Sequence, residues 1–373
     1  MDRPRSDRRR VRVLHVLNQL RASGAEVMLH GAARQWKHHG VEAEILAVAP
    51  AAGSFAADLQ AVGYVVAHEP DERLLRVPAR LARRVRDGGF DVVHLHAERG
   101  CFYFGLAALT GGAGVVRTVH SVFGFDGVLR LKRELQRRIL RRMGVVHVGV
   151  SHGVADNERL RFRNPAEIVN NWYGDEFEPP TSAQRVAARI ALGLEADAAV
   201  AVSVGNCAPV KRHEAILEAL AHPACPPGLM YLHVGEEEAG HAERRLVERL
   251  GLSDRTRFLG RVHPLQALHA ADVFIMTSAY EGLGLAAVEA VATGLPTVLA
   301  DVPGLRDVAQ ASPSAVLTDI APAQLAETIG RAVRTADTRS AADLRALRAR
   351  YSMQRGVACY AGIYRRLAAA GER

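Results

Sequence analysis

The segment EGLGLAAVE at residues 281–289 places two carboxylates eight positions apart around a glycine turn. Gly282 and Gly284 let the backbone approach a ligand closely. A turn that opens a helix points backbone N–H groups and the positive end of the helix dipole outward, which suits a phosphate. Eight residues of helix rise about 12 Å, so Glu281, in the turn, and Glu289, in the helix, could meet different parts of one ligand. Because carboxylates repel phosphate, the expected ligand has hydroxyls on both sides of a diphosphate, as a nucleotide sugar does.

Two further segments suit the same ligand. Residues 23–26 (SGAE) form a small turn ahead of a helix, although such a turn is by itself more often only a connection. Residues 204–213 (VGNCAPVKRH) follow a strand in the second half of the chain. Lys211 can place a point charge on a diphosphate and its departing oxygen, although a lone lysine is usually an ordinary surface residue. The three loops together predict a diphosphate site.

These loops need a sheet to position them, and the chain has the pattern of parallel α/β structure, in which apolar strands alternate with helical segments. The predicted strands lie at residues 11–20, 42–50, 90–98, 114–121 and 145–151, and then at 199–206, 230–238, 256–262, 272–280 and 296–302. Asn170 to Gly174 and then Pro179-Pro180 predict an interdomain linker. We therefore expect two α/β halves with a cleft between them.

The predicted domain boundaries follow from this pattern and from length, because 373 residues are too many for one ordinary core. Residues 1–10 are interpreted as a disordered basic tail. The first Rossmann-like domain is expected to span 11–175 and the second 176–350. Residues 351–373 are expected to form helices that cross back to the first domain.

Composition excludes some classes of protein. No apolar run reaches the ~18–20 residues of a membrane span, and the basic N-terminus lacks the apolar region of a signal peptide. The four cysteines lack metal-ligand spacing, so neither a zinc site nor a disulfide framework is expected, and the predicted location is cytoplasmic. The formal charge of +8 favours acidic partners such as nucleotide diphosphates, anionic lipids or nucleic acid. With 5% aromatic residues and no basic–aromatic interleaving, nucleic acid is not expected.

The chain resembles the retaining, nucleotide-sugar-dependent glycosyltransferases of family 4, which have the GT-B architecture of two Rossmann-like parallel-sheet domains facing across a cleft. The matching segments are SGAE at 23–26, DVVHLH at 91–96, TVHS at 118–121, VGVS at 148–151, VGNCAPVKRH at 204–213 and EGLGLAAVEAVATGLPTV at 281–298. The resemblance runs from Val11 to about Tyr364, and its last block is the most specific. It implies transfer of a hexose-type sugar from a nucleotide diphosphate, UDP more often than GDP, to an acceptor hydroxyl.

The resemblance also implies roles for particular residues. His120 would line the cleft near the reacting sugar, Lys211 would bind the diphosphate, and Glu281 would hold hydroxyls of the transferred sugar. Glu289 would bind the ribose hydroxyls, a bidentate task that suits a carboxylate. The other implied donor-binding positions are Gly24, Gly205, Asn206, Arg212, Arg261, Val262, Gly282, Leu283, Gly284 and Leu285.

One position departs from the family. Asn206 stands where the family commonly has a basic residue, so stabilisation of the leaving group would rest on Lys211, a helix N-terminus and Arg212. The resemblance further implies that the donor's anomeric configuration is retained, and that a phosphate oxygen accepts the acceptor's proton. It implies no metal or other cofactor, and the acidic run Glu236 to Glu238 is interpreted as a solvated loop. His94 and His96 alternate on a strand and are interpreted as a packed pair, with a place for His96 near the cleft as the alternative.

Residues 129–143 predict a basic amphipathic helix. Leu131, Leu135, Ile139 and Met143 recur every four residues among seven Arg and Lys residues. The favoured interpretation is a helix that packs this stripe on the sheet and turns its arginines to water. The alternative is peripheral contact with the inner face of a membrane, which would suit a lipid-linked acceptor. A surface-polysaccharide intermediate and a small secondary metabolite are both open as acceptors.

Two rival functions remain at this point. A sugar-nucleotide epimerase or hydrolase could share the architecture, although EGLGLAAVE argues against it. A non-catalytic basic module would bind membranes or nucleic acid in a salt-sensitive way and would have no affinity for nucleotide sugars.

Overall fold

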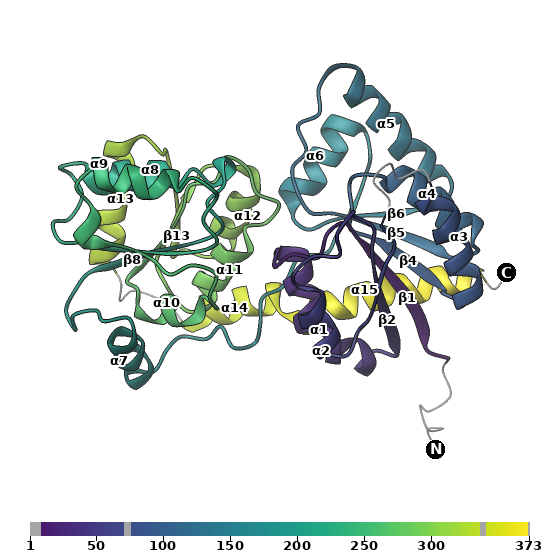
Figure 1. Ribbon diagram of the computed structural model, residues 1–373, viewed down its shortest axis with the longest axis horizontal. Helices are drawn as coiled ribbons and strands as arrows, with labels where there is room; N and C mark the ends of the chain where they lie inside the picture. Colours follow the sequence, from purple (N-terminus) through teal and green to yellow (C-terminus); the bar gives the residue numbers. More distant parts are fainter. Residues whose placement is uncertain (1–8, 71–75, 336–340, 372–373) are drawn as a thin grey trace. The chain divides into compact units, whose positions relative to one another are not determined.

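The computed structural model describes residues 9–70, 76–335 and 341–371, with no side-chain description for residues 341–343. The chain forms two units, drawn in Figure 1. Unit 1 contains the residues up to Trp172 together with those from Ser352 onward, and unit 2 spans Tyr173–Tyr351. Each unit is a parallel sheet covered by helices on both faces, so each has its own core.

The sheet of unit 1 has the strand order β3-β2-β1-β4-β5-β6-β7, with every pairing parallel. Its strands are β1 (Val11–Leu17), β2 (Val41–Ala47), β3 (Val65–His68), β4 (Val92–Leu95), β5 (Gly114–Val119), β6 (Val146–Gly149) and β7 (Glu167–Ile168). From β1 the strand order runs toward one edge of the sheet through β2 and β3, and from β4 it runs toward the other edge through β5, β6 and β7. The switch point of this order lies between β1 and β4. In such sheets, ligands bind outside the carboxyl ends of the strands at this switch point.

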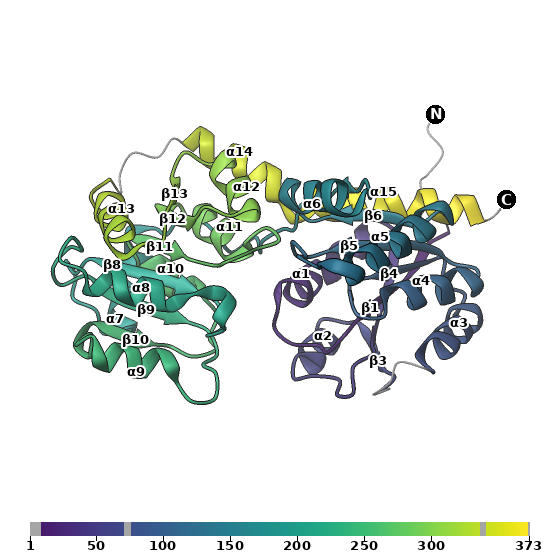
Figure 2. The ribbon, with the colours of Figure 1, turned by 90° about the horizontal axis from the view of Figure 1, so that it is seen from above.

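Helices cover both faces of this sheet, as Figures 1 and 2 show. One face packs against α1 (Gly24–His38), α2 (Ala56–Ala61) and α15 (Met353–Gly371), and the other against α3 (Val77–Gly88), α4 (Cys101–Thr110) and α5 (Gly127–Arg142). Helix α6 (His152–Phe162) packs beside α5. Gly356 lets α15 approach closely, because a Cβ atom there would lie 2.1 Å from the ring of Trp172.

The sheet of unit 2 has the order β10-β9-β8-β11-β12-β13, also with parallel pairings. Its strands are β8 (Val200–Val204), β9 (Met230–Val234), β10 (Thr256–Phe258), β11 (Val273–Met276), β12 (Thr297–Ala300) and β13 (Ala315–Thr318). Here the switch point lies between β8 and β11. Both of these strands are almost entirely buried, as expected for apolar strands inside a parallel sheet.

Helices also cover both faces of this second sheet (Figure 1). The helices are α7 (Ser182–Ala191), α8 (His213–Ala221), α9 (Ala242–Arg249), α10 (Leu265–Ala270), α11 (Leu285–Ala292), α12 (Pro303–Ala311), α13 (Pro322–Arg334) and α14 (Ala341–Tyr351), with short 3₁₀ turns η1 (Pro209–Lys211) and η2 (Ser253–Arg255). Side chains of α8, α9 and α13 share one apolar cluster with the sheet. Thr181 and Gln184 form a reciprocal capping box that fixes the start of α7.

The predicted parallel α/β fold with two sheets is confirmed. The ten predicted strands are present, but the short strands β3, β7 and β13 were not anticipated. Glu281 was expected in the turn and Glu289 in the helix, and both positions are confirmed, but the expected rise of eight helical residues was wrong, because α11 begins only at Leu285. Glu281 therefore lies in the loop before the helix, and only the second half of the segment has helical rise. The four cysteines are free thiols.

The favoured interpretation of residues 129–143 was also wrong. Helix α5 does not bury its apolar stripe, because Leu131, Leu135 and Met143 are exposed. The buried residues of this helix are instead Arg137 and Leu140. Within the described residues, none of the helices has the length and apolar character needed to cross a membrane.

Candidate functional site

Two of the three predicted diphosphate loops meet at the switch point of unit 2, at the carboxyl ends of β8 and β11. The first loop leaves β8 at Gly205 and passes through η1, and the second leaves β11 at Thr277 and enters α11. Gly205 has a φ of 154° and would bring a Cβ atom within 3.3 Å of the Lys211 side chain. A side chain here would crowd the lysine, so glycine leaves Lys211 room to adopt its position.

Lys211 and Glu281 form a direct ion pair. The Nζ atom of Lys211 donates to Oε1 of Glu281 at 2.6 Å, and both side chains are partly buried. An ammonium group has three donors, so two remain for other oxygens, and Glu281 keeps a second carboxylate oxygen. The pair thus places a cation for phosphate and an acceptor for hydroxyls next to each other.

Arg212 makes structural contacts that the sequence did not indicate. Its guanidinium donates to the carbonyl oxygens of Thr277 at 3.0 Å and Ser278 at 3.1 Å. The Thr277 hydroxyl donates back to the carbonyls of Lys211 and Arg212, at 3.0 and 2.8 Å. Arg212 therefore ties the two loops together, which fixes Lys211 relative to the second loop and leaves the positive charge at the pair to Lys211.

Glu289 is buried on α11 and lacks a hydrogen-bond or ion-pair partner among the described residues. Burial, with a smaller contribution from the nearby Glu176 carboxylate, raises the pKa of Glu289 to about 8. A buried carboxyl group without a partner is costly, because nothing replaces the water that it has lost. Glu289 is therefore ready to accept hydrogen bonds from a ligand.

Two glycines allow the close packing of the turn that precedes α11. Gly284 has a φ of 77°, and a Cβ atom there would lie 2.4 Å from Leu305. Gly304, in the first turn of α12, lies so close that its own Cβ atom would meet the Glu281 carbonyl oxygen at 2.5 Å. Both glycines are thus needed for this loop conformation. Gly282 and Leu283 are buried beside Gly284, and Leu285 opens the helix.

Asn206 and the pair Arg261–Val262 lie on neighbouring loops of the same unit. The side-chain oxygen of Asn206 accepts from the backbone N–H of Glu236 at 3.0 Å, which joins the loops after β8 and β9. Arg261 and Val262 are exposed on the loop that follows β10. The structure thus places these residues along one edge of one sheet.

In unit 1, three histidines form a hydrogen-bonded chain at the corresponding switch point. The Nδ1 atom of His15 lies 3.0 Å from Nε2 of His96, and Nδ1 of His96 lies 2.9 Å from Nε2 of His120. Burial lowers the pKa of His120 to about 4, with help from Arg117, and lowers that of His15 to about 3. The rings are therefore neutral near pH 7, so each carries one ring N–H and the chain of donors runs in a single direction. His15 was not anticipated, although its register opposite His94 follows from the strand pairing.

His94 is fully occupied by structural contacts. Its Nδ1 lies 2.6 Å from the Tyr364 hydroxyl, and its Nε2 lies 2.7 Å from the Thr118 hydroxyl. Potential ligand atoms of His15, His94 and His96 lie within 4.8 Å of one another, a proximity that sequence spacing did not indicate. Both nitrogens of His94 have hydroxyl partners, one of which is Tyr364 on α15, so His94 holds α15 against the sheet.

Gly24 begins α1 at the same edge of unit 1. A Cβ atom at this position would meet nothing within 4 Å, so open space lies beside it. The Ser23 hydroxyl donates to Glu26, whose pKa is raised by burial. Glycine is therefore not required here by the packing of the protein itself.

Comparison with known proteins matches two family models to the chain. "Glycosyltransferase Family 4" matches residues 22–173, and "Glycosyl transferases group 1" matches residues 184–346. A D-inositol 3-phosphate glycosyltransferase of Geodermatophilus obscurus is 38% identical over 159 residues, 39% of this chain and 35% of that protein. The chain thus spans about a third of the length of this curated relative. A putative glycosyltransferase, EpsF of Bacillus subtilis, is 28% identical over 78% of this chain and 79% of that protein.

Among solved structures, Anabaena Alr3699/HepE in complex with UDP and glucose matches with a TM-score of 0.77 at 18% identity, covering 95% of this chain and 99% of that one. The two parallel sheets and this likeness define a GT-B fold. The two family models together match most of the chain. The protein belongs to the group 1 glycosyltransferases.

Proposed function

We propose that this protein transfers a hexose-type sugar from a UDP-sugar donor to an acceptor hydroxyl, and that it retains the donor's anomeric configuration. The observation that carries the proposal is the Lys211–Glu281 pair, 2.6 Å long, on the same sheet edge as the buried Glu289, which has no partner in the described part of the chain. A nucleotide sugar supplies what each group lacks: hydroxyls for both carboxylates and phosphate oxygens for the ammonium group.

In this proposal the donor binds to unit 2. Glu289 accepts hydrogen bonds from the two ribose hydroxyls, which favours the ionised carboxylate. Amides of the turn before α11 and the start of that helix face the phosphates, where their partial positive charge is stabilising. The exposed loop at Arg261 and Val262 contacts the base.

The chemical step separates charge, because positive charge develops on the sugar ring and negative charge on the departing phosphate. Lys211 keeps two donors for the leaving phosphate oxygen, while Glu281 holds the sugar hydroxyls. One ion pair thus contacts both the sugar and the diphosphate, the two groups that separate in the reaction. We propose that a phosphate oxygen accepts the proton of the acceptor hydroxyl, so that the reaction needs no protein base and no resident metal. Neutral His120 offers a hydrogen bond to the sugar and no positive charge.

Relatives support the class of ligand. Matched relatives are named D-inositol 3-phosphate glycosyltransferases, and a structural neighbour holds UDP and glucose. For this chain, a lipid-linked intermediate of a surface polysaccharide and a small hydroxylated metabolite are the acceptor classes we propose, with a cytoplasmic location where nucleotide sugars are available.

The test is a thermal-shift panel of nucleotide sugars on the purified protein, because a ligand that binds only the folded state raises the unfolding midpoint. One UDP-sugar should stabilise the protein, and Glu281→Gln should abolish its turnover while free UDP still binds. Glu327→Gln, which changes an exposed carboxylate on α13, is the matched control.

Product analysis with the stabilising donor then separates the rival activities. Transfer of the sugar to an added acceptor supports the proposal. If the donor is hydrolysed or epimerised at the same rate with and without acceptor, the protein is instead a hydrolase or an epimerase. If no nucleotide sugar shifts the midpoint, the donor assignment is wrong.

A further inference from the structure

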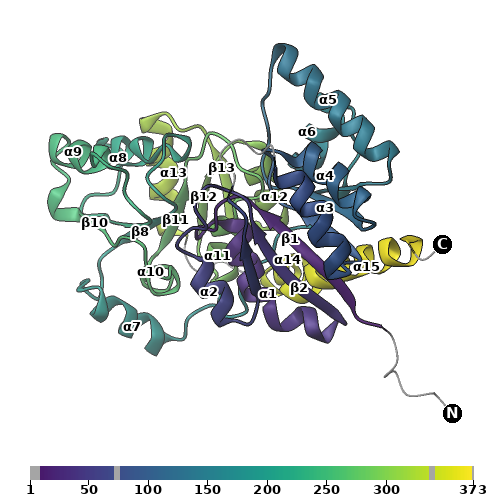
Figure 3. The ribbon, with the colours of Figure 1, turned by 45° about the vertical axis from the view of Figure 1, so that its right-hand side comes forward.

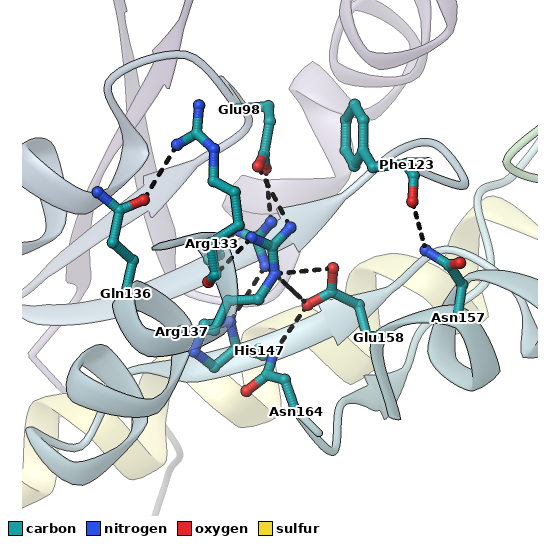
Figure 4. Close-up of polar contacts among 10 residues, drawn as sticks. Glu98, Phe123, Arg133, Gln136, Arg137, His147, Asn157, Glu158 and Asn164 are labelled. Atoms are coloured by element: carbon teal, nitrogen blue, oxygen red, sulfur yellow. Dashed lines mark hydrogen bonds and ion pairs between the residues drawn. The ribbon is translucent and has the colours of Figure 1, made fainter. Parts of the chain in front are cut away.

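Helix α5 buries a charged side chain against the rest of its unit. Arg137 is buried between two carboxylates, as Figure 4 shows. Its Nε donates to both oxygens of Glu158, at 3.0 and 2.9 Å, and its Nη2 donates to Glu98 at 3.2 Å. Arg117 donates to the same two carboxylates, at 2.5 and 3.1 Å. Two arginines and two glutamates thus form a closed ion cluster beneath the helix.

This cluster fixes which side of α5 faces inward. Burial alone would raise the pKa of Glu158, but Arg117 and Arg137 outweigh it and lower the pKa to about 2. The Arg137 guanidinium also lies over the ring of Phe162, 4.2 Å from its centroid. If α5 rotated about its axis, it would leave Glu158 with a single arginine partner in a buried site, which is strongly unfavourable.

The opposite side of α5 carries an apolar row whose members are exposed, except for the half-buried Ile139. We call it the outer row, and it consists of Val128, Leu131, Leu135, Ile139 and Met143. Their spacing of three to four residues places them on one face of a helix. Arg137 is nine residues from Val128, about two and a half turns, and therefore lies on the reverse side. Val128 is 83% exposed, and Leu131 and Leu135 are each 57% exposed.

Basic residues border this row. On the helix surface, Lys132, Arg138 and Arg142 lie beside members of the outer row, and Lys132 and Arg142 are exposed. The single acidic residue of the helix, Glu134, is mostly buried and lies 3.7 to 3.9 Å from Arg130, Arg138 and Arg163. Figure 3 shows α5 at the outer edge of its unit. The exposed face of α5 is therefore both apolar and positively charged.

We propose that the outer row of α5 docks on the surface of a membrane that contains anionic lipids. An interfacial helix buries its apolar side chains at the boundary of headgroups and acyl chains, and its binding strengthens with attraction to anionic headgroups. Lys132, Arg138 and Arg142 supply that attraction. The ion cluster around Arg137 keeps the apolar side outward, so the docking face is preformed.

Other occupants fit the face less well. A second copy of the chain would bring the basic border of one α5 against the same basic border of the other, and the like charges would repel. A polyanion such as nucleic acid would pair with the arginines but leave the outer row in water. An anionic lipid surface is complementary to both features.

The test measures co-sedimentation of the full chain with two kinds of vesicle, neutral phosphatidylcholine and the same lipid with about one-third phosphatidylglycerol. We expect binding to the anionic vesicles and little to the neutral ones. Leu131→Gln together with Leu135→Gln keeps the charge and should weaken binding at least tenfold. Lys132→Gln together with Arg142→Gln should weaken binding to anionic vesicles, at about fivefold per charge.

The matched control lies on α7 of unit 2, where Val186 is 56% exposed and Ile190 is 72% exposed one turn later. Val186→Gln with Ile190→Gln should leave vesicle binding unchanged. The proposal is overturned if the leucine variant binds as the wild type does, since net charge alone would then explain binding. It is also overturned if the chain forms a dimer that the leucine variant abolishes. The assay contains no nucleotide sugar, so its outcome is independent of the proposed transfer reaction.

Discussion

The buried Glu289 carboxyl group makes donor affinity depend on pH in a defined direction. With a pKa of about 8, Glu289 is mostly protonated in the free protein at pH 7. Ribose hydroxyls that donate to it favour the ionised form, so donor binding should lower its pKa and release a proton. Affinity for a UDP-sugar should therefore rise with pH and level off above the free-state pKa.

The magnitude follows from the fraction of the free protein that carries the ionised carboxylate. For a free pKa of about 8 and a bound pKa near the ordinary value, affinity should increase roughly eightfold between pH 7 and pH 8.5. About 0.9 proton should be released per donor bound at pH 7. Burial lowers the pKa of the nearby His213 and His233 to about 3 and 4, so neither ring titrates in this range.

The measurement is calorimetric titration of a UDP-sugar at several pH values, in buffers that differ in ionisation enthalpy. Glu289→Gln is the control, because it cannot release a proton, and it should bind weakly with a flat pH profile. A flat profile for the wild type, or the same slope in the variant, would refute the assignment of Glu289 to the ribose.

The same group predicts an effect on stability without ligand. The folded-state pKa is raised above the unfolded value of 4.5, so folding favours the protonated carboxyl group. This costs nothing well below pH 4.5, and the cost grows as pH rises toward 8. Glu289→Gln should accordingly raise the apo unfolding midpoint at pH 8 and leave it unchanged at pH 4. A midpoint lowered at pH 8 would mean that the carboxylate has a stabilising partner.

Three further predictions concern other residues. Lys211→Ala should reduce turnover about 10²–10³-fold with little change in the unfolding midpoint, because the side chain is partly exposed and stabilises the departing phosphate; steady-state kinetics showing less than a tenfold loss would move that role elsewhere. Gly24→Ala should preserve the midpoint, since open space surrounds its Cβ position, whereas Gly284→Ala should destabilise unit 2 by about 1–3 kcal/mol through its clash with Leu305; equal unfolding midpoints for the two variants would contradict this steric account. Tyr364→Phe should cost about 1–2 kcal/mol in urea unfolding, because it leaves a nitrogen of buried His94 without its partner; an unchanged unfolding transition would show that the hydrogen bond adds nothing.

The sequence determined the fold class because its signals are local. Apolar strands such as 199–204 and 272–276 are buried on both faces of a parallel sheet, so their composition reveals them without any knowledge of their neighbours. The turn around Gly284 was also legible, since glycine there meets a conformational requirement that few residues satisfy. The contact between Lys211 and Glu281 depends on the strand order, which places β8 beside β11 and so brings their two loops together.

Tertiary structure alone decided the partners of charged and polar groups. The helical period of α5 identified an apolar face and a basic face but not which one turns inward, and that choice was made by Glu98 and Glu158 on other segments. The carbonyls of Thr277 and Ser278 that accept hydrogen bonds from Arg212 belong to a loop about 65 residues further along the chain. His15 joined the histidine chain only through strand pairing. Sequence periodicity indicates which residues share a face of a helix, so that property could be predicted. Ion-pair and hydrogen-bond partners come from segments distant in sequence, so they could not be predicted.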